Sequence, residues 1–151
     1  MDRRAVNNKP ILLVEDNPDD VTFTLRAFRQ NNIGNEVVVA SDGEQALQVL
    51  LPSSAARAFQ PALVLLDIKL PKIDGLDVLR RIRADPRTES LPVVVLTTSN
   101  EETDIVSAYR LGANSFVRKP VAFSDFLNVA KMLGMYWLVL NQPAPEWASG
   151  G

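Results

Sequence analysis

The 151-residue chain contains neither cysteine nor histidine. The absence of cysteine excludes disulfides, thiolate metal sites and a cysteine nucleophile, and it fits a reducing compartment such as the cytoplasm. The absence of histidine excludes a Ser/His/Asp triad, a histidine base and a phosphohistidine formed on this chain itself.

An excess of one charge and long apolar runs are missing too. The chain has 16 basic and 18 acidic residues, interspersed, and a net charge of -2. It therefore lacks the electrostatic footprint of a nucleic-acid or anionic-membrane binder. No apolar run approaches the ~20 residues that span a bilayer, and the first residues lack the apolar segment of a signal peptide. We expect a cytoplasmic protein that binds neither nucleic acid nor membrane.

What the chain does have is the material for one folded domain. With 46% hydrophobic residues over 151 positions, it is long enough to bury a sizeable core. The polar stretch 1–9 is expected to be a short leader, residues 10–140 the domain, and the proline-containing stretch 141–151 a loose tail. We detect no internal repeat of fixed period.

The most informative stretch is the apolar run 63–66, which stops at a single acid, Asp67. A run of this kind between Pro61 and Pro71 predicts a strand buried on both faces, as in a parallel sheet covered by helices. A second such run, 11–14, also ends in acids, Glu15 and Asp16. Both acids and Asp67 would then lie where α/β sheets bind their ligands, beyond the carboxyl ends of the strands.

Three further strands and five helices complete the pattern. Strands are expected at 36–40, at 91–96 before Thr97, and at 114–117 before Arg118 and Lys119. The first helix begins at Asn17-Pro18 and the last runs from about 122 towards 140, while 52–60 is expected to be an insertion loop. This alternation predicts a doubly wound five-stranded parallel α/β sheet, flavodoxin-like, with strand order 2-1-3-4-5 and five helices.

In that topology the ends of four strands converge, bringing five polar side chains together: Glu15, Asp16, Asp67, Thr97 and Lys119. Neighbouring carboxylates repel each other, by roughly 4 kcal/mol per pair at ~4 Å and an effective dielectric of ~20. Such a cluster either retains a proton or binds a cation. Because all of its ligands are hard oxygens, the expected cation is Mg²⁺, or Mn²⁺.

A carboxylate beside such a cation, with a hydroxyl and an ammonium group nearby, can accept a phosphoryl group. Asp67 would be the nucleophile and would become an aspartyl phosphate, while Lys119 and Thr97 would bind phosphoryl oxygens. Asp19, Asp20 and Asp74 are expected to have no part in this, the first two only favouring the positive end of the first helix and Asp74 forming a turn. Because the chain has no histidine, the phosphoryl donor must be another molecule.

These motifs resemble the receiver domain of response regulators in two-component signalling, over roughly Ile11 to Leu140. The motifs that carry the resemblance are Glu15-Asp16, Leu-Leu-Asp-Ile-Lys-Leu-Pro around Asp67, Asp74-Gly75, Thr97 after its apolar strand, Gly112-Ala113, and Lys119-Pro120. The resemblance implies a phosphoprotein rather than an enzyme, one that takes its phosphoryl group from a sensor histidine kinase and slowly loses it to water. It also implies that the fourth helix, fifth strand and fifth helix form a surface that phosphorylation alters.

The resemblance assigns roles to individual residues. Asp67 is the phosphoacceptor, Asp16 and, less directly, Glu15 bind the metal, and the backbone carbonyl of Lys69 completes the metal shell. Thr97 senses the phosphoryl group and Lys119 stabilises its charge. Phe116 stands where the family has an aromatic switch residue, although it could equally be plain core. The family further suggests a cis peptide bond between Lys119 and Pro120.

A narrower resemblance is to the stand-alone regulators of bacterial phytochrome histidine kinases. It rests on the acidic stretch 15–20, the enlarged connection before the third strand, and an apolar final helix followed by prolines with no output domain. A regulator without an output domain would act through a partner or as a shuttle in a phosphorelay. The kinase could sense a stimulus other than light.

The stretch 132–140 of the final helix is apolar or uncharged all round. Because a helix packed on a sheet needs only about half its circumference apolar, part of this one is expected to face a partner. The alternative is that it folds over its own domain. The prediction is a symmetric homodimer with Tyr136, Trp137 and Leu140 in the interface.

Three other functions compete with this one. A Mg²⁺-dependent phosphatase with an aspartyl nucleophile would, by resemblance, carry a second acid two residues later as general acid, where this chain has Lys69. A flavin-binding electron carrier would need a phosphate-binding loop after the first strand, where the acids Glu15 and Asp16 would repel the flavin phosphate. A receiver-like scaffold that is never phosphorylated would not need the complete acceptor set.

Overall fold

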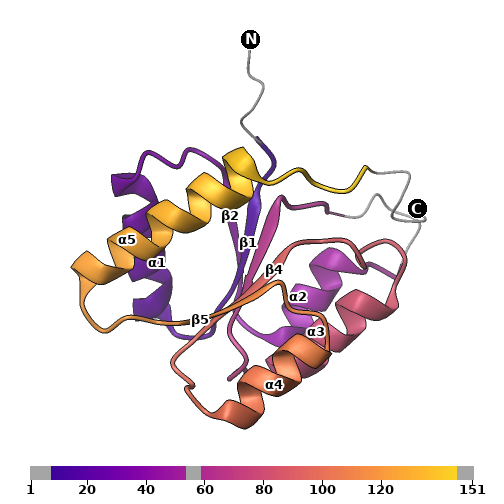
Figure 1. Ribbon diagram of the computed structural model, residues 1–151. Helices are drawn as coiled ribbons and strands as arrows, with labels where there is room; N and C mark the ends of the chain where they lie inside the picture. The colour runs from indigo at the N-terminus through magenta and orange to yellow at the C-terminus, as the bar shows by residue number, and fades with distance from the viewer. Residues whose placement is uncertain (1–7, 54–58, 146–151) are drawn as a thin grey trace.

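The computed structural model describes residues 8–53 and 59–145, and within them five strands form one parallel sheet (Figure 1). The strands are β1 (Ile11–Val14), β2 (Val37–Ala40), β3 (Leu63–Leu66), β4 (Val93–Thr97) and β5 (Ser115–Arg118). Their order in the sheet is β2-β1-β3-β4-β5. The predicted flavodoxin-like sheet is therefore confirmed.

Helices cover both faces of this sheet, which explains why its central strands are uniformly apolar. The helices are α1 (Pro18–Gln30), α2 (Gly43–Leu50), α3 (Gly75–Ala84), α4 (Glu102–Arg110) and α5 (Phe123–Leu133). Figure 1 shows α1 and α5 on one face and α2, α3 and α4 on the other, and each layer closes over its own hydrophobic cluster. Every residue of β1, β3 and β4 is buried, whereas the edge strand β5 is only partly so.

The last helix is not the single helix that the sequence predicts. It changes at Gly134 into a π-helical segment, η2 (Gly134–Leu140). A Cβ at Gly134 would lie 2.7 Å from Cδ1 of Ile33, so the Ile33 side chain, in the loop after α1, would have to shift to admit a side chain there. Apolar spacing does not distinguish an α-helix from the wider π-helix over two turns, which is why the change could not be predicted.

The start of α3 lies directly against the backbone of the β3 end. A Cβ at Gly75 would overlap the backbone oxygen of Asp67 and the Cα of Ile68, and the Gly75 amide donates to the carbonyl of Ile68 at 3.1 Å. Only glycine permits so close an approach. The position of Asp67 is therefore fixed by backbone packing as well as by the sheet.

Several predictions fall wholly or partly on residues 1–7, 54–58 and 146–151, which lie outside the described residues. They concern the leader, the tail and most of the insertion loop. In the part of the chain that the structure does describe, no helix is long and apolar enough to cross a membrane.

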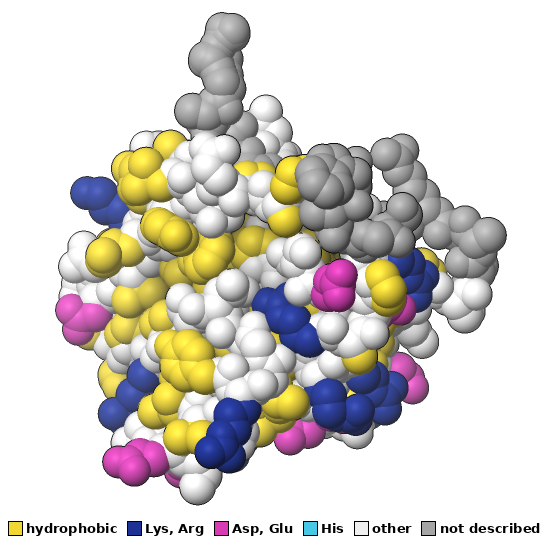
Figure 2. Space-filling view, turned by 45° about the vertical axis from the view of Figure 1, so that its right-hand side comes forward, with side chains coloured by type: hydrophobic (Ala, Val, Ile, Leu, Met, Phe, Trp, Pro, Cys, Tyr) yellow, Lys and Arg dark blue, Asp and Glu magenta, His cyan; other side chains and the backbone are white. Residues whose placement is uncertain are grey.

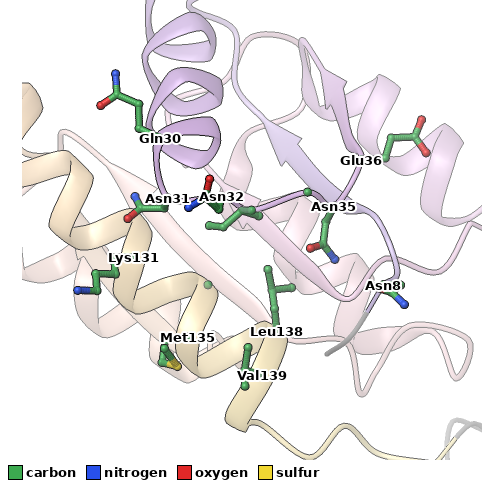
Figure 3. A pocket seen from close by; sticks show the side chains of 13 residues that line it. Asn8, Gln30, Asn31, Asn32, Asn35, Glu36, Lys131, Met135, Leu138 and Val139 are labelled. Carbon is green, nitrogen blue, oxygen red and sulfur yellow. The ribbon is translucent and has the colours of Figure 1, made fainter. Parts of the chain in front are cut away.

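A hollow of about 720 Å³ opens between the loop after α1 and the segment η2 (Figure 3). Asn8 precedes β1 and Glu36 precedes β2, so the hollow lies at the amino ends of the strands. Its lining is mainly amide and apolar, with Lys131 and Glu36 as its charged side chains. It is thus distinct from the acidic edge at the carboxyl ends, to which the predicted chemistry belongs.

Candidate functional site

The strand register places the predicted site residues next to one another. Val14 of β1 pairs with Leu66 of β3, so the residues that follow, Glu15 and Asp67, leave the sheet side by side. Thr97 ends β4 opposite Arg118 of β5, and Lys119 follows that pair. The structure thus brings together the five side chains expected at this edge: Glu15, Asp16, Asp67, Thr97 and Lys119.

Both carboxylate oxygens of Asp67 are held by hydrogen bonds. Oδ1 accepts from the Thr97 hydroxyl at 2.8 Å and from the Lys69 amide at 3.0 Å. Oδ2 accepts from Nζ of Lys119 at 3.0 Å. Because Asp67 is buried, these donors replace the water that would otherwise stabilise its charge.

Lys119 is the cationic centre of the site. Its amide donates to the carbonyl of Thr97 at 2.7 Å, which fixes the residue at the end of β5. Its Nζ donates to three carboxylates, those of Glu15, Asp20 (2.9 Å) and Asp67 (3.0 Å). Burial lowers the pKa of Lys119, but the bonds to Glu15 and Asp20 and the charges of Asp67 and Glu15 outweigh burial and raise it above its ordinary value. Lys119 therefore stays protonated.

Glu15 shows the opposite balance. Burial raises the pKa of Glu15, and the hydrogen bond and charge of Lys119 only partly offset that rise. Its second carboxylate oxygen accepts from the Asn17 amide at 3.2 Å. Glu15 thus belongs to the lysine network and to the turn that starts α1 at the same time.

The carboxylates of Glu15, Asp16 and Asp67 fit a divalent cation. One oxygen from each lies within 4.8 Å of the others, and Asp16 is exposed while the other two are buried. Mg²⁺ binds oxygens at about 2.0–2.1 Å, so the three carboxylates would draw closer together to hold one ion. The hard-oxygen donor set favours Mg²⁺ or Mn²⁺. The part assigned to the Lys69 carbonyl stays a prediction.

The expectation that Asp20 serves only the helix dipole is wrong, because its carboxylate accepts a hydrogen bond from Nζ of Lys119. Asp19, by contrast, is exposed at the same helix start. Asn17 caps α1, and its side chain accepts from the amides of both aspartates. A residue three positions after the cap projects back over the helix start, so this spacing was the available signal for Asp20.

The bond between Lys119 and Pro120 is trans, so the expected cis bond is wrong. The trans form is the intrinsically preferred one even before proline. With the trans peptide bond, the backbone amide of Lys119 donates a hydrogen bond to the carbonyl of Thr97, and its Nζ reaches the carboxylates.

Phe116, the predicted switch residue, is half-buried in β5 and packs against the cluster beneath α2, α3 and α4. Its amide donates to the Tyr109 hydroxyl of α4 at 3.2 Å, a link that sequence analysis missed. Asp104 of α4 makes a second link, to the ends of two strands: it accepts from Ser99, after β4, at 2.6 Å and pairs with Lys69, after β3, at 3.6 Å. The switch role of Phe116 stays a prediction.

The predicted dimer residues lie in η2, away from the acidic edge. Tyr136 and Leu140 are exposed, whereas Trp137 is half-buried and packs against the cluster beneath α1 and α5. The rings of Tyr136 and Trp137 meet edge to face with centroids 4.8 Å apart. Trp137 therefore also belongs to the core of its own domain.

Comparison with known proteins identifies the family. The family model of the response regulator receiver domain matches residues 11–131. The chain belongs to this family. It is 38% identical over 136 residues to the probable methanogenesis regulatory protein FilR2 of Methanothrix harundinacea, covering 89% of this chain and 88% of that protein. It is 34% identical over 131 residues to the response regulator Rcp1 of Synechocystis sp., covering 86% and 89%.

Solved structures of similar proteins include several response regulators of phytochromes. The phosphorylated cyanobacterial phytochrome response regulator RcpA is 35% identical, with a TM-score of 0.83 over 91% of this chain and 99% of its own. The bacteriophytochrome response regulator AtBRR is 47% identical, with a TM-score of 0.68 over 89% and 98%. The Mn²⁺-bound form of Rcp1 is 33% identical, with a TM-score of 0.82 over 91% and 99%. This receiver domain is therefore similar to phytochrome response regulators.

Proposed function

We propose that this receiver domain accepts a phosphoryl group on Asp67 from the phosphohistidine of a partner histidine kinase. An oxygen of Asp67 bonds to phosphorus while the bond from phosphorus to the imidazole nitrogen breaks, and the electron pair stays on that nitrogen. The observation that carries the proposal is the position of Asp67, in contact with Thr97 and Lys119 and within the group of carboxylates that fits a divalent cation.

The side chains divide the work of this transfer. Glu15, Asp16 and Asp67, with the Lys69 carbonyl, would hold Mg²⁺ or Mn²⁺, which supplies charge neutralisation for the incoming phosphoryl oxygens. Lys119 donates to a phosphoryl oxygen in place of Asp67 Oδ2, and the hydroxyl of Thr97 turns to another. Later attack by water at phosphorus releases phosphate and restores the Asp67 carboxylate. The protein acts as a switch whose own turnover is slow.

Movement of Thr97 would be transmitted to the surface formed by α4, β5 and α5. The route is the core around Phe116, together with the Tyr109 hydroxyl that joins α4 to β5. Because Phe116 has no hydroxyl of its own, Tyr109 is the group that can hold or release the strand edge here.

The partner kinase we propose is a phytochrome. The support is the similarity to RcpA, a cyanobacterial phytochrome response regulator, and to AtBRR, a bacteriophytochrome response regulator. FilR2 is described as a methanogenesis regulator, so similarity at this level also extends to another role.

A homodimer through the last helix is the second part of the proposal. Figure 2 shows one face of the molecule on which hydrophobic side chains form a broad patch bordered by charged ones. On α5 and η2 the exposed apolar side chains are Met132, Met135, Tyr136 and Leu140. Several exposed apolar side chains on one element favour association.

The proposed acceptor is tested by intact-mass measurement after incubation with acetyl phosphate and Mg²⁺, or with a phosphorylated kinase. The wild type should gain one phosphoryl group and Asp67→Asn none. An adduct on the variant would move the acceptor elsewhere. A wild type that stays unmodified with both donors would favour the scaffold that is never phosphorylated.

A further inference from the structure

Lys119 distributes its bonds over carboxylates of two kinds. An ammonium group has three N–H donors, and here the three acceptors are Glu15, Asp20 and Asp67. Glu15 and Asp67 also belong to the carboxylate group that fits a divalent cation, and Asp20 does not. Asp20 is thus the partner of Lys119 that has no share in the proposed metal site.

The local backbone explains why Asp20 is available for this contact. In a helix start capped by Asn17, the residue at the third helical position normally returns a hydrogen bond to the cap amide. Here the cap amide of Asn17 donates to Glu15 instead. The Asp20 carboxylate is therefore free to turn to Lys119, at 2.9 Å.

We propose that Asp20 is a positioning residue, which holds Lys119 over the acceptor while Glu15 and Asp67 are engaged with the metal. This inference rests on the proposed function. Once Glu15 and Asp67 turn their oxygens to Mg²⁺, their hold on Nζ weakens, because one lone pair cannot serve both cations fully. Asp20 then keeps one N–H of Lys119 in place, which leaves another aimed at the incoming phosphoryl oxygen.

Acetyl phosphate is the phosphoryl donor in the test, and the transfer needs no other reactant. Acetyl phosphate transfers its phosphoryl group to an oxygen of Asp67, the bond from phosphorus to the acetyl oxygen breaks, and acetate leaves with the electron pair. Lys119 stabilises the charge on the phosphoryl oxygens during transfer. If Lys119 is less firmly positioned, the rate constant of phosphoryl transfer falls, although the same bonds form and break.

The chain offers a matched control for the substitution. Asp19→Asn removes the same charge from the same helix turn, but Asp19 is exposed and only its amide contacts Asn17. Asp20→Asn should lower the maximal rate of phosphorylation at saturating Mg²⁺ about tenfold, the effect of losing a hydrogen bond between charged groups, and Asp19→Asn less than twofold. The Mg²⁺ dissociation constant, measured by calorimetry, should change equally and little in both variants.

A double-mutant cycle separates positioning of Lys119 from general structural damage. In a Lys119→Met background, Asp20→Asn should cause no further loss of rate, because Asp20 then has nothing to hold. A wild type that is phosphorylated while Asp20→Asn equals Asp19→Asn overturns the inference alone, as does a tenfold loss that persists in the Lys119→Met background. A wild type that accepts no phosphoryl group overturns the proposed function and the inference together.

Discussion

The hydroxyl of Thr97 lies 2.8 Å from Oδ1 of Asp67, and both side chains are buried. This contact joins the ends of β3 and β4 before any phosphoryl group is present. The hydroxyl must exchange a carboxylate oxygen for a phosphoryl oxygen if it is to report phosphorylation. The contact that holds the resting site together is therefore the one that the proposed signal breaks.

Replacing Thr97 with alanine should separate phosphorylation from its readout. Asp67 keeps its bonds to Lys69 and Lys119, so phosphorylation persists, whereas the change transmitted towards Phe116 is lost. The measurement is the NMR shift of the Phe116 amide when beryllofluoride and Mg²⁺ are added. It should be large in the wild type and in Thr97→Ser, and nearly absent in Thr97→Ala. An equal shift in Thr97→Ala would show that the hydroxyl does not carry the signal.

Removing the charge of Lys119 should leave the buried carboxylates of Glu15 and Asp67 without their cation. We expect Lys119→Met to lower the free energy of unfolding by about 3 kcal/mol in EDTA, because an unpaired buried charge is strongly destabilising. Urea denaturation in EDTA and in Mg²⁺ measures this. Mg²⁺ should recover more stability in the variant than in the wild type, since it meets carboxylates that no ammonium neutralises. Equal recovery in both proteins would contradict the shared network.

Magnesium itself should stabilise the wild type through Asp16. A ligand bound only by the folded state adds about 2.7 kcal/mol at a hundred times its dissociation constant. Asp16 is exposed, so Asp16→Asn should leave the metal-free melting temperature nearly unchanged and abolish most of the increase with Mg²⁺. The increase should survive in Asp19→Asn. An unaltered increase in Asp16→Asn would place the ion elsewhere.

Gly75 offers a test of how backbone packing fixes the acceptor. A methyl group at Gly75 would overlap the carbonyl of Asp67, so Gly75→Ala should cost about 2–3 kcal/mol of stability and slow phosphorylation. Gly34→Ala is the control, because nothing lies within 4 Å of the added Cβ there. Both variants are measured by urea denaturation and by phosphorylation rate. A Gly75→Ala protein as stable as Gly34→Ala would show that α3 can move away without loss.

Two features of the sequence account for the part of the fold and site that could be predicted. Continuous apolar runs that end in Glu15, Asp67 and Thr97 indicated buried strands, because burial is recorded directly in a sequence. The alternation of strands with helices indicated the sheet order and the edge at which the polar groups meet. Which side chains at that edge form hydrogen bonds with each other does not follow from burial. Asp20 looked like its neighbour Asp19 because both suit a helix start, and only its spacing from the cap, three positions after Asn17, separates it in the sequence.

The last helix shows the same limit on a larger scale. Its apolar composition indicated a second contact surface, but composition could not show which side its own domain would use. The structure directs Leu133 and Leu138 inwards and leaves Met132 and Leu140 outside. It also changes the helix type at Gly134, which alters the angular position of every later residue.

The difference between inward-facing and outward-facing side chains of the last helix decides how the proposed homodimer should be tested. Trp137 packs against its own core, so a charge there would damage the fold and the interface alike. Tyr136 and Leu140 are 51% and 61% exposed, and the double substitution to glutamate should convert a wild-type dimer to a monomer in sedimentation equilibrium. Val39→Glu, on the edge strand β2 and 37% exposed, is the control and should stay dimeric. A monomeric wild type, or a double variant that still sediments as a dimer, would leave this surface without a role in self-association, because the outward-facing side chains of η2 are the ones that must desolvate for two copies to bind.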